Sequence, residues 1–256
     1  MKMIVTGSEG FIGKFLCQKL SERGVDVIGI DRKSGDEAAG IGKLLMGGGI
    51  DCVFHLAAQT SVFNDDLEQI RRDNIDTFMS VADACNESKV KLVYASSSTA
   101  NPCNTTSMYG MTKRFDEQYA RVYCPDATGV RLHNVYGPNP RRGTLLWHLM
   151  NEEEVKLYNN GGNIRCFTYI DDILEALLYG FGCGEKLVNA ANPEEMTVRR
   201  FAEAVKGYNG VRLRYVDDKR PLDNFCQTVD EHLFLVPLSY TPVAEGLLKV
   251  FDGQKR

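Results

Sequence analysis

The sequence has no long apolar run, no basic cluster and no paired cysteine motif. None of its 256 residues falls in an apolar stretch approaching the roughly 20 residues of a membrane-spanning helix. The 30 Lys and Arg and 34 Asp and Glu are spread along the chain, for a formal net charge of −4, so no charged patch favours a nucleic acid or an anionic membrane as partner. We therefore expect a soluble globular protein that binds a small molecule.

The eight cysteines also lack the spacing of a zinc site or a disulfide framework. Several of them stand inside apolar strand or helix patterns, which indicates reduced thiols and no metal centre. The first residues, MKMIVTGSEG, pass directly into a short apolar strand and a glycine turn, without the roughly 7 to 15 apolar residues of a secretory signal. We expect a cytoplasmic protein.

Short β-rich runs alternate with helix-period segments in the first half of the chain. This alternation is typical of a parallel sheet with helices on both faces. The expected strands lie at residues 2–7, 25–31, 51–58, 91–98 and 128–137. The expected helices lie at residues 11–24, 71–88 and 108–123.

After residue 137 the pattern becomes less regular. The expected elements are a helix at 144–153, strands at 155–162 and 164–172, and a strand and helix within 186–207. The sequence therefore predicts an α/β fold, a Rossmann-type doubly wound parallel sheet with a smaller, less regular α/β substrate domain. We place the dinucleotide-binding domain at 1–138, completed by a strand and helix from about 166–191, and the substrate domain at 139–256.

A glycine turn, TGSEGFIG, joins the first expected strand to the first helix. Gly7 permits the tight turn, Gly10 lets the backbone approach a pyrophosphate, and Gly13 allows the helix to pack closely on the strand. The free N–H groups of the helix terminus favour the same phosphate. We assign the turn, including Phe11 and Ile12, to a dinucleotide cofactor.

Asp31 ends the second expected strand, where a carboxylate accepts hydrogen bonds from the adenosine ribose and repels a 2′-phosphate. This favours NAD over NADP. Arg32 and Lys33 follow directly, and either could pair with a 2′-phosphate, so NADP remains the alternative.

Tyr109 and Lys113 stand four residues apart on an expected helix and therefore share one face. A phenol is a weak base near neutral pH, but an adjacent ammonium favours its phenolate and makes it a useful general base. Ser98 ends the preceding strand, at the sheet edge where ligands of such folds bind. A Tyr-x-x-x-Lys pair alone arises easily by chance among eleven tyrosines. The catalytic interpretation depends on the whole series, in which the glycine turn, Asp31, the serine run and the Tyr-x-x-x-Lys pair follow one another in this order.

Further motifs extend through nearly the whole chain: DCVFHLAAQTSV, RRDNIDT, LVYASSS, MYGMTK, GVRLHNVYGP, VKLYNNGGNIRCFTYIDD, LVNAANPEEMTVRRFAEAV and KRPLDN. Together with the glycine turn they resemble the extended short-chain dehydrogenase/reductases, specifically the NAD-dependent epimerase/dehydratase family acting on nucleotide sugars. The resemblance implies that Ser98, Tyr109 and Lys113 are catalytic, with Tyr109 removing the proton of a sugar hydroxyl.

The resemblance also implies roles in binding. Leu56, Ala57 and Ala58 in HLAA would lie beside the cofactor, and Asn74 would be a polar support of its site. The residues expected to contact the substrate are Asn134, Arg165 and Arg220 at its diphosphate and Tyr158 at its base. Simpler readings stay open: a helix cap for Asn74, surface charges for the two arginines, and a buried aromatic for Tyr158.

Two departures from the family narrow the function. Only nineteen residues, 32–50, separate Asp31 from DCVFHLAA, too few for the usual helix and third strand, so we expect a deletion that leaves Asp36 near the adenine. Nucleotide-sugar 4-ketoreductases have a similarly short link. The residues after Ser98 contain no Asp-Glu pair, so the acid and base of a sugar dehydration are missing.

The link between Ser98 and Tyr109 is also short, which predicts an open site closed by a partner, by the substrate domain or not at all. His55 and His133 read as packed strand residues, because neither has a partner at ligand spacing. Cys103 reads as an inert loop thiol, with a second acid/base near the sugar as the alternative.

We expect an NAD-dependent nucleotide-sugar epimerase, most simply at C4 through a transient 4-keto sugar. The alternatives are an NAD(P)H-dependent 4-keto-sugar reductase and, in another class, a non-catalytic NAD-binding sensor or scaffold. The expected partner is a nucleotide-diphosphate sugar. The resemblance also implies a homodimer formed through the helices that contain NIDTFMSVADAC and MYGMTKRFDEQYARVY.

Overall fold

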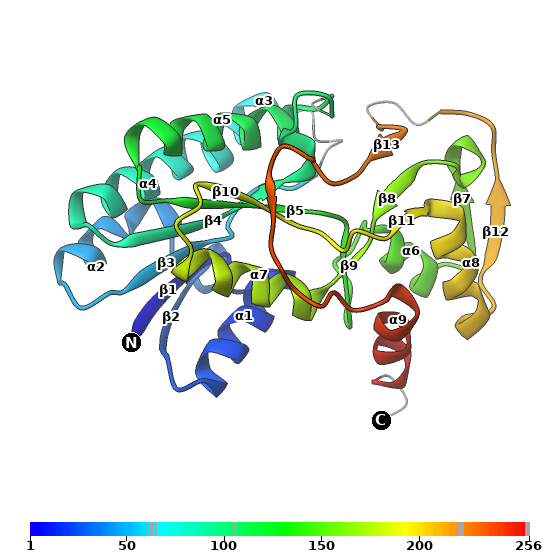
Figure 1. The fold of residues 1–256 in the computed structure, drawn as a ribbon, viewed down its shortest axis with the longest axis horizontal. Helices are drawn as coiled ribbons and strands as arrows, with labels where there is room; N and C mark the ends of the chain where they lie inside the picture. The colour runs from blue at the N-terminus through cyan, green and yellow to red at the C-terminus, as the bar shows by residue number, and fades with distance from the viewer. Residues whose placement is uncertain (62–63, 65, 105, 220–222, 254–256) are drawn as a thin grey trace.

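The computed structural model describes residues 1–61, 64, 66–104, 106–219 and 223–253. Its centre is a seven-stranded parallel sheet in the order β14-β10-β5-β4-β3-β1-β2 (Figure 1). The strands are β1 (Lys2–Thr6), β2 (Asp26–Ile30), β3 (Cys52–His55), β4 (Lys91–Ser97), β5 (Thr128–Leu132), β10 (Leu187–Ala190) and β14 (Phe234–Leu235). The predicted Rossmann-type fold is confirmed.

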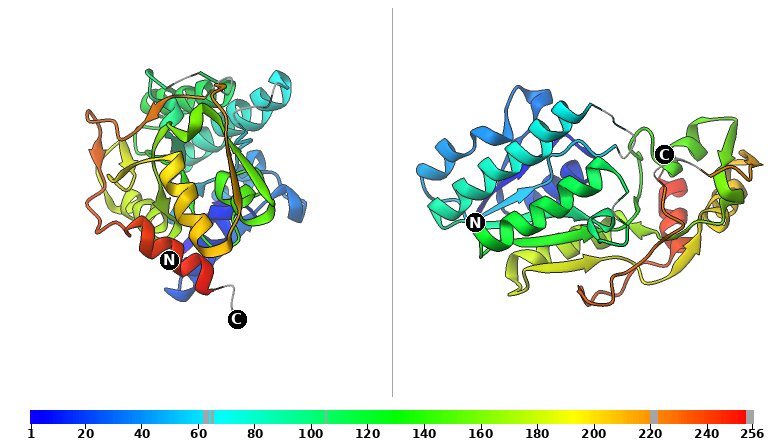
Figure 2. Two further views of the ribbon diagram at one scale, coloured as in Figure 1. Left: turned by 90° about the vertical axis from the view of Figure 1, so that its right-hand side faces the viewer. Right: turned by 90° about the horizontal axis from the view of Figure 1, so that it is seen from above.

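Helices cover both faces of this sheet because its central strands, such as β3 and β4, are buried on both sides. On one face lie α1 (Phe11–Glu22) and α7 (Ile170–Gly182), and on the other lie α2 (Gly42–Met46), α4 (Thr77–Ser88) and α5 (Met108–Tyr123). The right-hand view of Figure 2 shows α4 and α5 side by side across their face. Two separate apolar cores result, one on each side of the sheet.

The helix predicted at 71–88 begins earlier and contains an irregular turn. A short helix α3 (Leu67–Ile70) runs into a π-helical turn, η3 (Arg71–Asp76), and then into α4. π-Helical turns are rare and often mark functional positions.

The expected deletion after β2 is confirmed. Residues 32–50 form only the 3₁₀ turns η1 (Arg32–Ser34) and η2 (Ala38–Gly40) and the helix α2, so β2 stays at the edge of the sheet. At the opposite edge stands β14, which the sequence pattern did not predict. It pairs in parallel with β10 and comes from the last part of the chain. The domain boundaries at 138 and 139 remain a prediction.

The single strand predicted at 128–137 is wrong in one respect. It divides into β5 and β6 (Val135–Tyr136), because the backbone turns at Asn134, whose φ is +28°. β6 pairs with β9 (Thr168–Tyr169) in a separate small sheet. The chain thus leaves the large sheet directly beyond its carboxyl edge.

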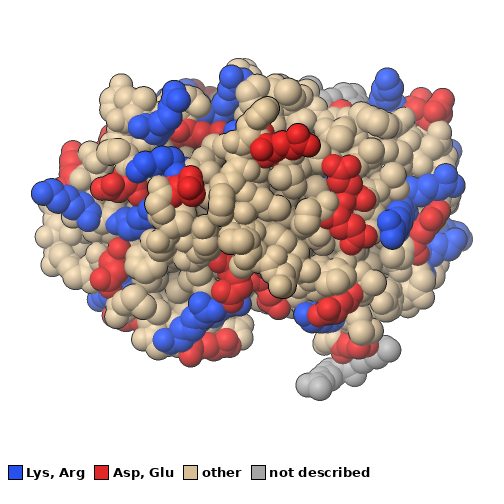
Figure 3. Space-filling model, in the orientation of Figure 1, with Lys and Arg blue, Asp and Glu red and all other residues tan. Residues whose placement is uncertain are grey.

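The second half adds a smaller layer beyond that edge, on the right of Figure 1. Its elements are α6 (Leu145–Asn151), β7 (Glu154–Leu157), the turn η5 (Tyr158–Gly161), β8 (Ile164–Cys166), β11 (Glu195–Thr197), α8 (Val198–Asn209), β12 (Arg212–Tyr215), β13 (Cys226–Gln227) and α9 (Val243–Asp252). On the face shown in Figure 3, acidic and basic side chains are interspersed. None of the helices in the described ranges has the length and apolar character needed to cross a membrane.

Candidate active site

A cavity of about 660 Å³ lies at the carboxyl edge of the sheet, between the sheet and the smaller layer. Nearly all of the predicted site residues line it: Gly7, Gly10, Phe11, Ile12, Gly13, Asp31, Arg32, Asp36, Leu56, Ala57, Ala58, Ser98, Tyr109, Lys113, Asn134, Tyr158 and Arg165. Asn74 lies behind its wall. Arg220 falls outside the described residues. The volume suits a ligand of dinucleotide or nucleotide-sugar size.

The glycine turn forms a cradle that larger residues would fill. Gly7 has φ +72°, and a Cβ built on it would lie 2.7 Å from the amide nitrogen of Ala57. A Cβ on Gly13 would lie 2.0 Å from the carbonyl oxygen of Gly7, which prevents α1 from approaching β1 with any other residue there. The cradle and the amino end of α1 therefore have the space and the free N–H groups that a pyrophosphate requires.

Asp31 is fixed by two backbone donors. Its Oδ2 accepts from the amide of Glu9 and its Oδ1 from the amide of Lys33, each at 3.0 Å. The carboxylate therefore faces the cavity in one fixed orientation, which suits a side chain that accepts hydrogen bonds from the ribose hydroxyls.

Asn74 holds the loop that follows β3. Its Oδ1 accepts from the amide of Gln59 at 2.7 Å, and its Nδ2 donates to the carbonyl of Gln59 at 2.9 Å and to Oγ1 of Thr112 at 3.0 Å. The π-helical turn η3 carries this side chain, which is 1% exposed, into the gap between the loop and α5. Asn74 thus supports the cavity from behind.

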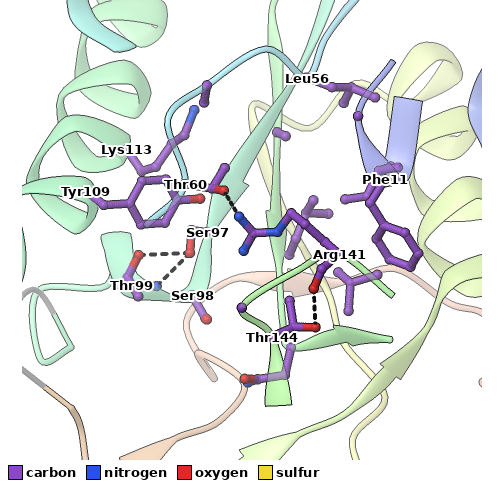
Figure 4. Close-up of a pocket in the computed structure, with 18 of the residues that line it drawn as sticks. Phe11, Leu56, Thr60, Ser97, Ser98, Thr99, Tyr109, Lys113, Arg141 and Thr144 are labelled. Atoms are coloured by element: carbon purple, nitrogen blue, oxygen red, sulfur yellow. Dashed lines mark hydrogen bonds between the residues drawn. The ribbon is translucent and has the colours of Figure 1, made fainter. Parts of the chain in front are cut away.

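Tyr109 and Lys113 both stand in the first two turns of α5, which begins at the N-cap Ser107. Figure 4 shows the Tyr109 ring reaching into the cavity from this helix, with Lys113 above it. Lys113 is 3% exposed, and its Nζ donates to Oδ2 of Asp116 at 3.0 Å. Burial opposes its charge, but Asp116 and the other acidic neighbours raise its pKa above the ordinary lysine value. The lysine beside Tyr109 therefore stays a cation.

The structure brings Ser97, and not Ser98, to the side of Tyr109. In Figure 4 the Ser97 hydroxyl lies on the Tyr109 side of the serine turn, whereas the Ser98 hydroxyl points away from it. Ser98 Oγ instead accepts from Nε2 of Gln227 at 2.7 Å. The physical reason is that β4 ends at Ser97 and the chain turns into η4 (Ser98–Ala100), which directs the next side chain toward β13. The predicted placement of Ser98 is corrected accordingly.

The short turn after the serines is held by the second half of the chain. Nδ2 of Asn224 donates to the carbonyl of Asn104 at 2.8 Å, and Asp223, Asn224 and Gln227 complete this wall of the cavity. The sequence predicts a site closed by a partner, by the substrate domain or not at all. In the structure the segment around β13, which belongs to the smaller layer, closes it. Cys103 is exposed and is not one of the lining residues.

Two arginines that could meet an anion reach the cavity, Arg165 from β8 and Arg141 from the loop before α6. Arg165 is 5% exposed, and its Nη2 donates to Oδ1 of Asp223 at 2.6 Å. Arg141, which the sequence analysis did not select, donates from Nη1 to Oγ1 of Thr60, and Figure 4 shows its guanidinium crossing the cavity between Tyr109 and Phe11. The adjacent Arg142 lies over Trp147 instead. Nothing in the pair of adjacent arginines indicates which one turns inward.

The two histidines considered earlier are buried strand-end residues. His55 is 2% exposed, and its Nδ1 lies 2.8 Å from Oγ1 of Thr6. Burial and the charge of Lys113 lower the pKa of His55 to about 3, and burial lowers that of His133 to about 4. Both are neutral near pH 7.

The comparisons with known proteins show the family of the chain. The model of the NAD dependent epimerase/dehydratase family matches residues 3–186. The chain belongs to this family. It is therefore an enzyme of a group whose cofactor is NAD, and the cradle and Asp31 are the residues that would hold it.

Protein CapI of Staphylococcus aureus is 30% identical over 228 residues, which cover 69% of this chain and 68% of CapI. Among solved structures, the complex of MoeE5 with UDP-glucuronic acid and NAD has a TM-score of 0.87 at 24% identity and covers 100% of this chain and 99% of MoeE5. The UDP-glucuronic acid 4-epimerase of Bacillus cereus has a TM-score of 0.84 at 23% identity, with coverage of 100% and 99%. At these identities the two structures establish the fold.

The buried pair of Lys113 and Asp116 leads to a prediction about stability. Burial raises the pKa of Asp116 to about 7, since it is 0% exposed and, among the described atoms, nothing donates to its Oδ1. The folded protein then keeps a proton that the unfolded chain releases near pH 3.8, so this contribution to stability is present below about pH 4 and lost as the pH rises through 7.

Between pH 5 and pH 8, the free energy of unfolding of the wild type should therefore fall more than that of Asp116→Asn, by roughly 1–3 kcal/mol. Urea unfolding at both pH values measures this difference. Asp126→Asn changes an exposed aspartate in the loop after the same helix and should keep the wild-type pH dependence. Parallel behaviour of the wild type and Asp116→Asn would contradict the assignment.

Proposed function

We propose that the protein is an NAD-dependent nucleotide-sugar epimerase acting at C4 through a transient 4-keto sugar, with Tyr109 as the base. The observation that supports this most directly is the grouping of the Tyr109 phenol, the Lys113 ammonium and a serine hydroxyl at one end of a cavity, with Arg165 among its other lining residues. The two solved structures named above, one a complex with UDP-glucuronic acid and the other a UDP-glucuronic acid 4-epimerase, support the same substrate class.

In this proposal each side chain has one task. Tyr109 accepts the proton of the C4 hydroxyl and later returns it, while Lys113 favours the phenolate. Ser97 donates a hydrogen bond to the C4 oxygen. NAD, held by the glycine cradle and Asp31, would supply a reversible hydride acceptor, and epimerisation would require the keto sugar to turn over in the cavity before reduction. Arg165 exchanges its bond to Asp223 for a diphosphate oxygen, and Asn134 and Tyr158 contact the nucleotide part.

The test is conversion without added cofactor. Purified protein should interconvert the C4 epimers of a UDP-hexose pair, followed by chromatography or NMR. Because Arg141 offers a guanidinium beside Tyr109, which suits a carboxylate, the panel should contain UDP-glucuronate as well as UDP-glucose and UDP-N-acetylglucosamine. Lack of conversion across such a panel would reject the proposal.

The second candidate is a nucleotide-4-keto-sugar reductase, which the short 32–50 link favours. It uses the same three side chains in the reverse direction and consumes reduced cofactor. Stoichiometric loss of NADH absorbance on addition of a 4-keto-6-deoxy sugar nucleotide would decide for it. We also infer a cytoplasmic homodimer formed through α4 and α5; the exposed apolar side chains of Met111 and Val122 on α5 are consistent with such a contact.

A further inference from the structure

The adenosine end of the cavity contains two cations whose position would suit a 2′-phosphate. Arg32 and Lys33 directly follow the ribose carboxylate Asp31, and both line the cavity. An arginine at this place is what accommodates the 2′-phosphate of NADP in dinucleotide-binding folds. Their presence therefore has to be reconciled with NAD as cofactor.

Both cations already have partners within the protein. Arg32 makes a two-pronged ion pair with Asp73, from Nη1 to Oδ1 and from Nη2 to Oδ2, each at 3.0 Å. Bidentate arginine–carboxylate pairs are strong and fixed in geometry. Lys33 donates from Nζ to the carbonyl of Glu9 at 3.3 Å. The guanidinium thus presents both of its terminal nitrogens to Asp73, which also lines the cavity.

Asp73 is well placed to hold the arginine. It lies in the π-helical turn η3, next to Asn74, and its side chain is 6% exposed, whereas that of Arg32 is 53% exposed. The bond to Asp73 raises the pKa of Arg32, in keeping with its permanent charge. Arg72 also places its Nε 3.8 Å from Oδ1 of Asp73, but Arg32 is the cation that meets both carboxylate oxygens. Exchange of Arg32 to a ligand phosphate would leave a carboxylate this far from water with one more distant cation, so it is unfavourable.

We propose that Asp73 is a cofactor-specificity residue: by holding Arg32 in a bidentate ion pair, it withholds the guanidinium from a 2′-phosphate and adds a second carboxylate, after Asp31, to the lining of the cavity. The enzyme then rejects NADP in spite of two basic residues next to its ribose site. Asp73 acts through Arg32 and is a positioning residue. The inference concerns dinucleotide binding alone and does not depend on which sugar reaction the enzyme performs.

The test is the ratio of the dissociation constants of NADP and NAD, measured by isothermal titration calorimetry on protein freed of bound nucleotide. Asp73→Asn keeps the shape of the side chain and removes the charge. It should lower the Kd for NADP by about tenfold or more, while the Kd for NAD changes by less than about threefold. Retained NAD binding also shows that the cradle is folded.

Two further variants make the result specific to Arg32. Asp76→Asn removes the same charge from the same turn η3, but Asp76 pairs with Arg71, so the ratio should stay at its wild-type value. The double variant Asp73→Asn with Arg32→Met should lose the gain in NADP affinity. A ratio within twofold of wild type for Asp73→Asn, or a gain that survives in the double variant, would overturn the proposal.

If Asp73→Asn does not fold, the wild type still tests the proposal. It should bind NADP at least about tenfold more weakly than NAD, because Arg32 is engaged by Asp73. A wild-type affinity for NADP equal to or above that for NAD would show that Arg32 serves the 2′-phosphate, and the proposal would fail.

Discussion

Tyr109→Phe should lower kcat by about 10³-fold on whichever nucleotide sugar the wild type converts, because the variant lacks the group that takes the C4 proton. The phenyl ring fills the same space in the wall of the cavity, so the Kd for NAD should change by less than about threefold. Steady-state kinetics and calorimetry measure the two quantities. The prediction separates the two enzyme candidates, which both need Tyr109, from a non-catalytic NAD-binding protein.

Tyr123→Phe is the matched control. Tyr123 lies at the last turn of the same helix α5, is 56% exposed and does not line the cavity, so the same change of one oxygen atom should leave kcat within about twofold. Tyr109→Phe that keeps more than a tenth of the wild-type kcat would show that another group is the base.

The helix that carries Tyr109 was predictable because its signals are local. Ser107 accepts from the amide of Gly110 as an N-cap, and the helix spans the predicted residues 108–123. The glycine turn is equally local, because steric crowding at Gly7 and Gly13 excludes every other residue type. Features that depend on the next few residues are therefore readable from the sequence.

The parts of the site that were missed depend on distant partners. Asp116 would read as a solvent-facing residue of α5, but it is fully buried because Lys113 supplies its counter-charge within the sheet-facing side of the helix. Glu117 is buried for the same kind of reason, since Arg131 of β5 binds it with Nε at 2.7 Å and Nη2 at 2.8 Å. Likewise, the role of Asp73 depends on its ion pair with Arg32, which lies 41 residues away in the sequence.

The choice between the serines had no signal in the sequence. A half-buried strand alternates polar and apolar residues, but β4 is buried on both faces, so Ser96, Ser97 and Ser98 look alike. Their partners differ in the structure. Ser96 donates to Glu117 at 2.6 Å and Ser98 accepts from Gln227, which leaves Ser97 on the Tyr109 side.

Ser97→Ala should lower kcat by about 10²-fold, whereas Ser98→Ala should lower it by less than about fivefold. A hydroxyl has one proton and two lone pairs. Ser97 Oγ accepts from the amide of Thr99 at 3.2 Å and from its Oγ1 at 2.8 Å, so the proton of Ser97 is directed elsewhere and is available to the substrate oxygen.

The effects on stability should have the opposite order. Ser98→Ala leaves Nε2 of Gln227 without its acceptor in a side chain that is 8% exposed, which should cost about 1–2 kcal/mol in the free energy of unfolding. Ser97→Ala affects a hydroxyl that faces the cavity, and Thr99 can turn to water there, so it should cost less than about 1 kcal/mol. Kinetics should therefore show the larger effect in Ser97→Ala, and urea unfolding should show the larger effect in Ser98→Ala. A large loss of kcat in Ser98→Ala together with a small one in Ser97→Ala would return the catalytic role to Ser98. A loss of about 1–2 kcal/mol in the free energy of unfolding leaves most of the enzyme folded, so it could not by itself lower kcat by a hundredfold.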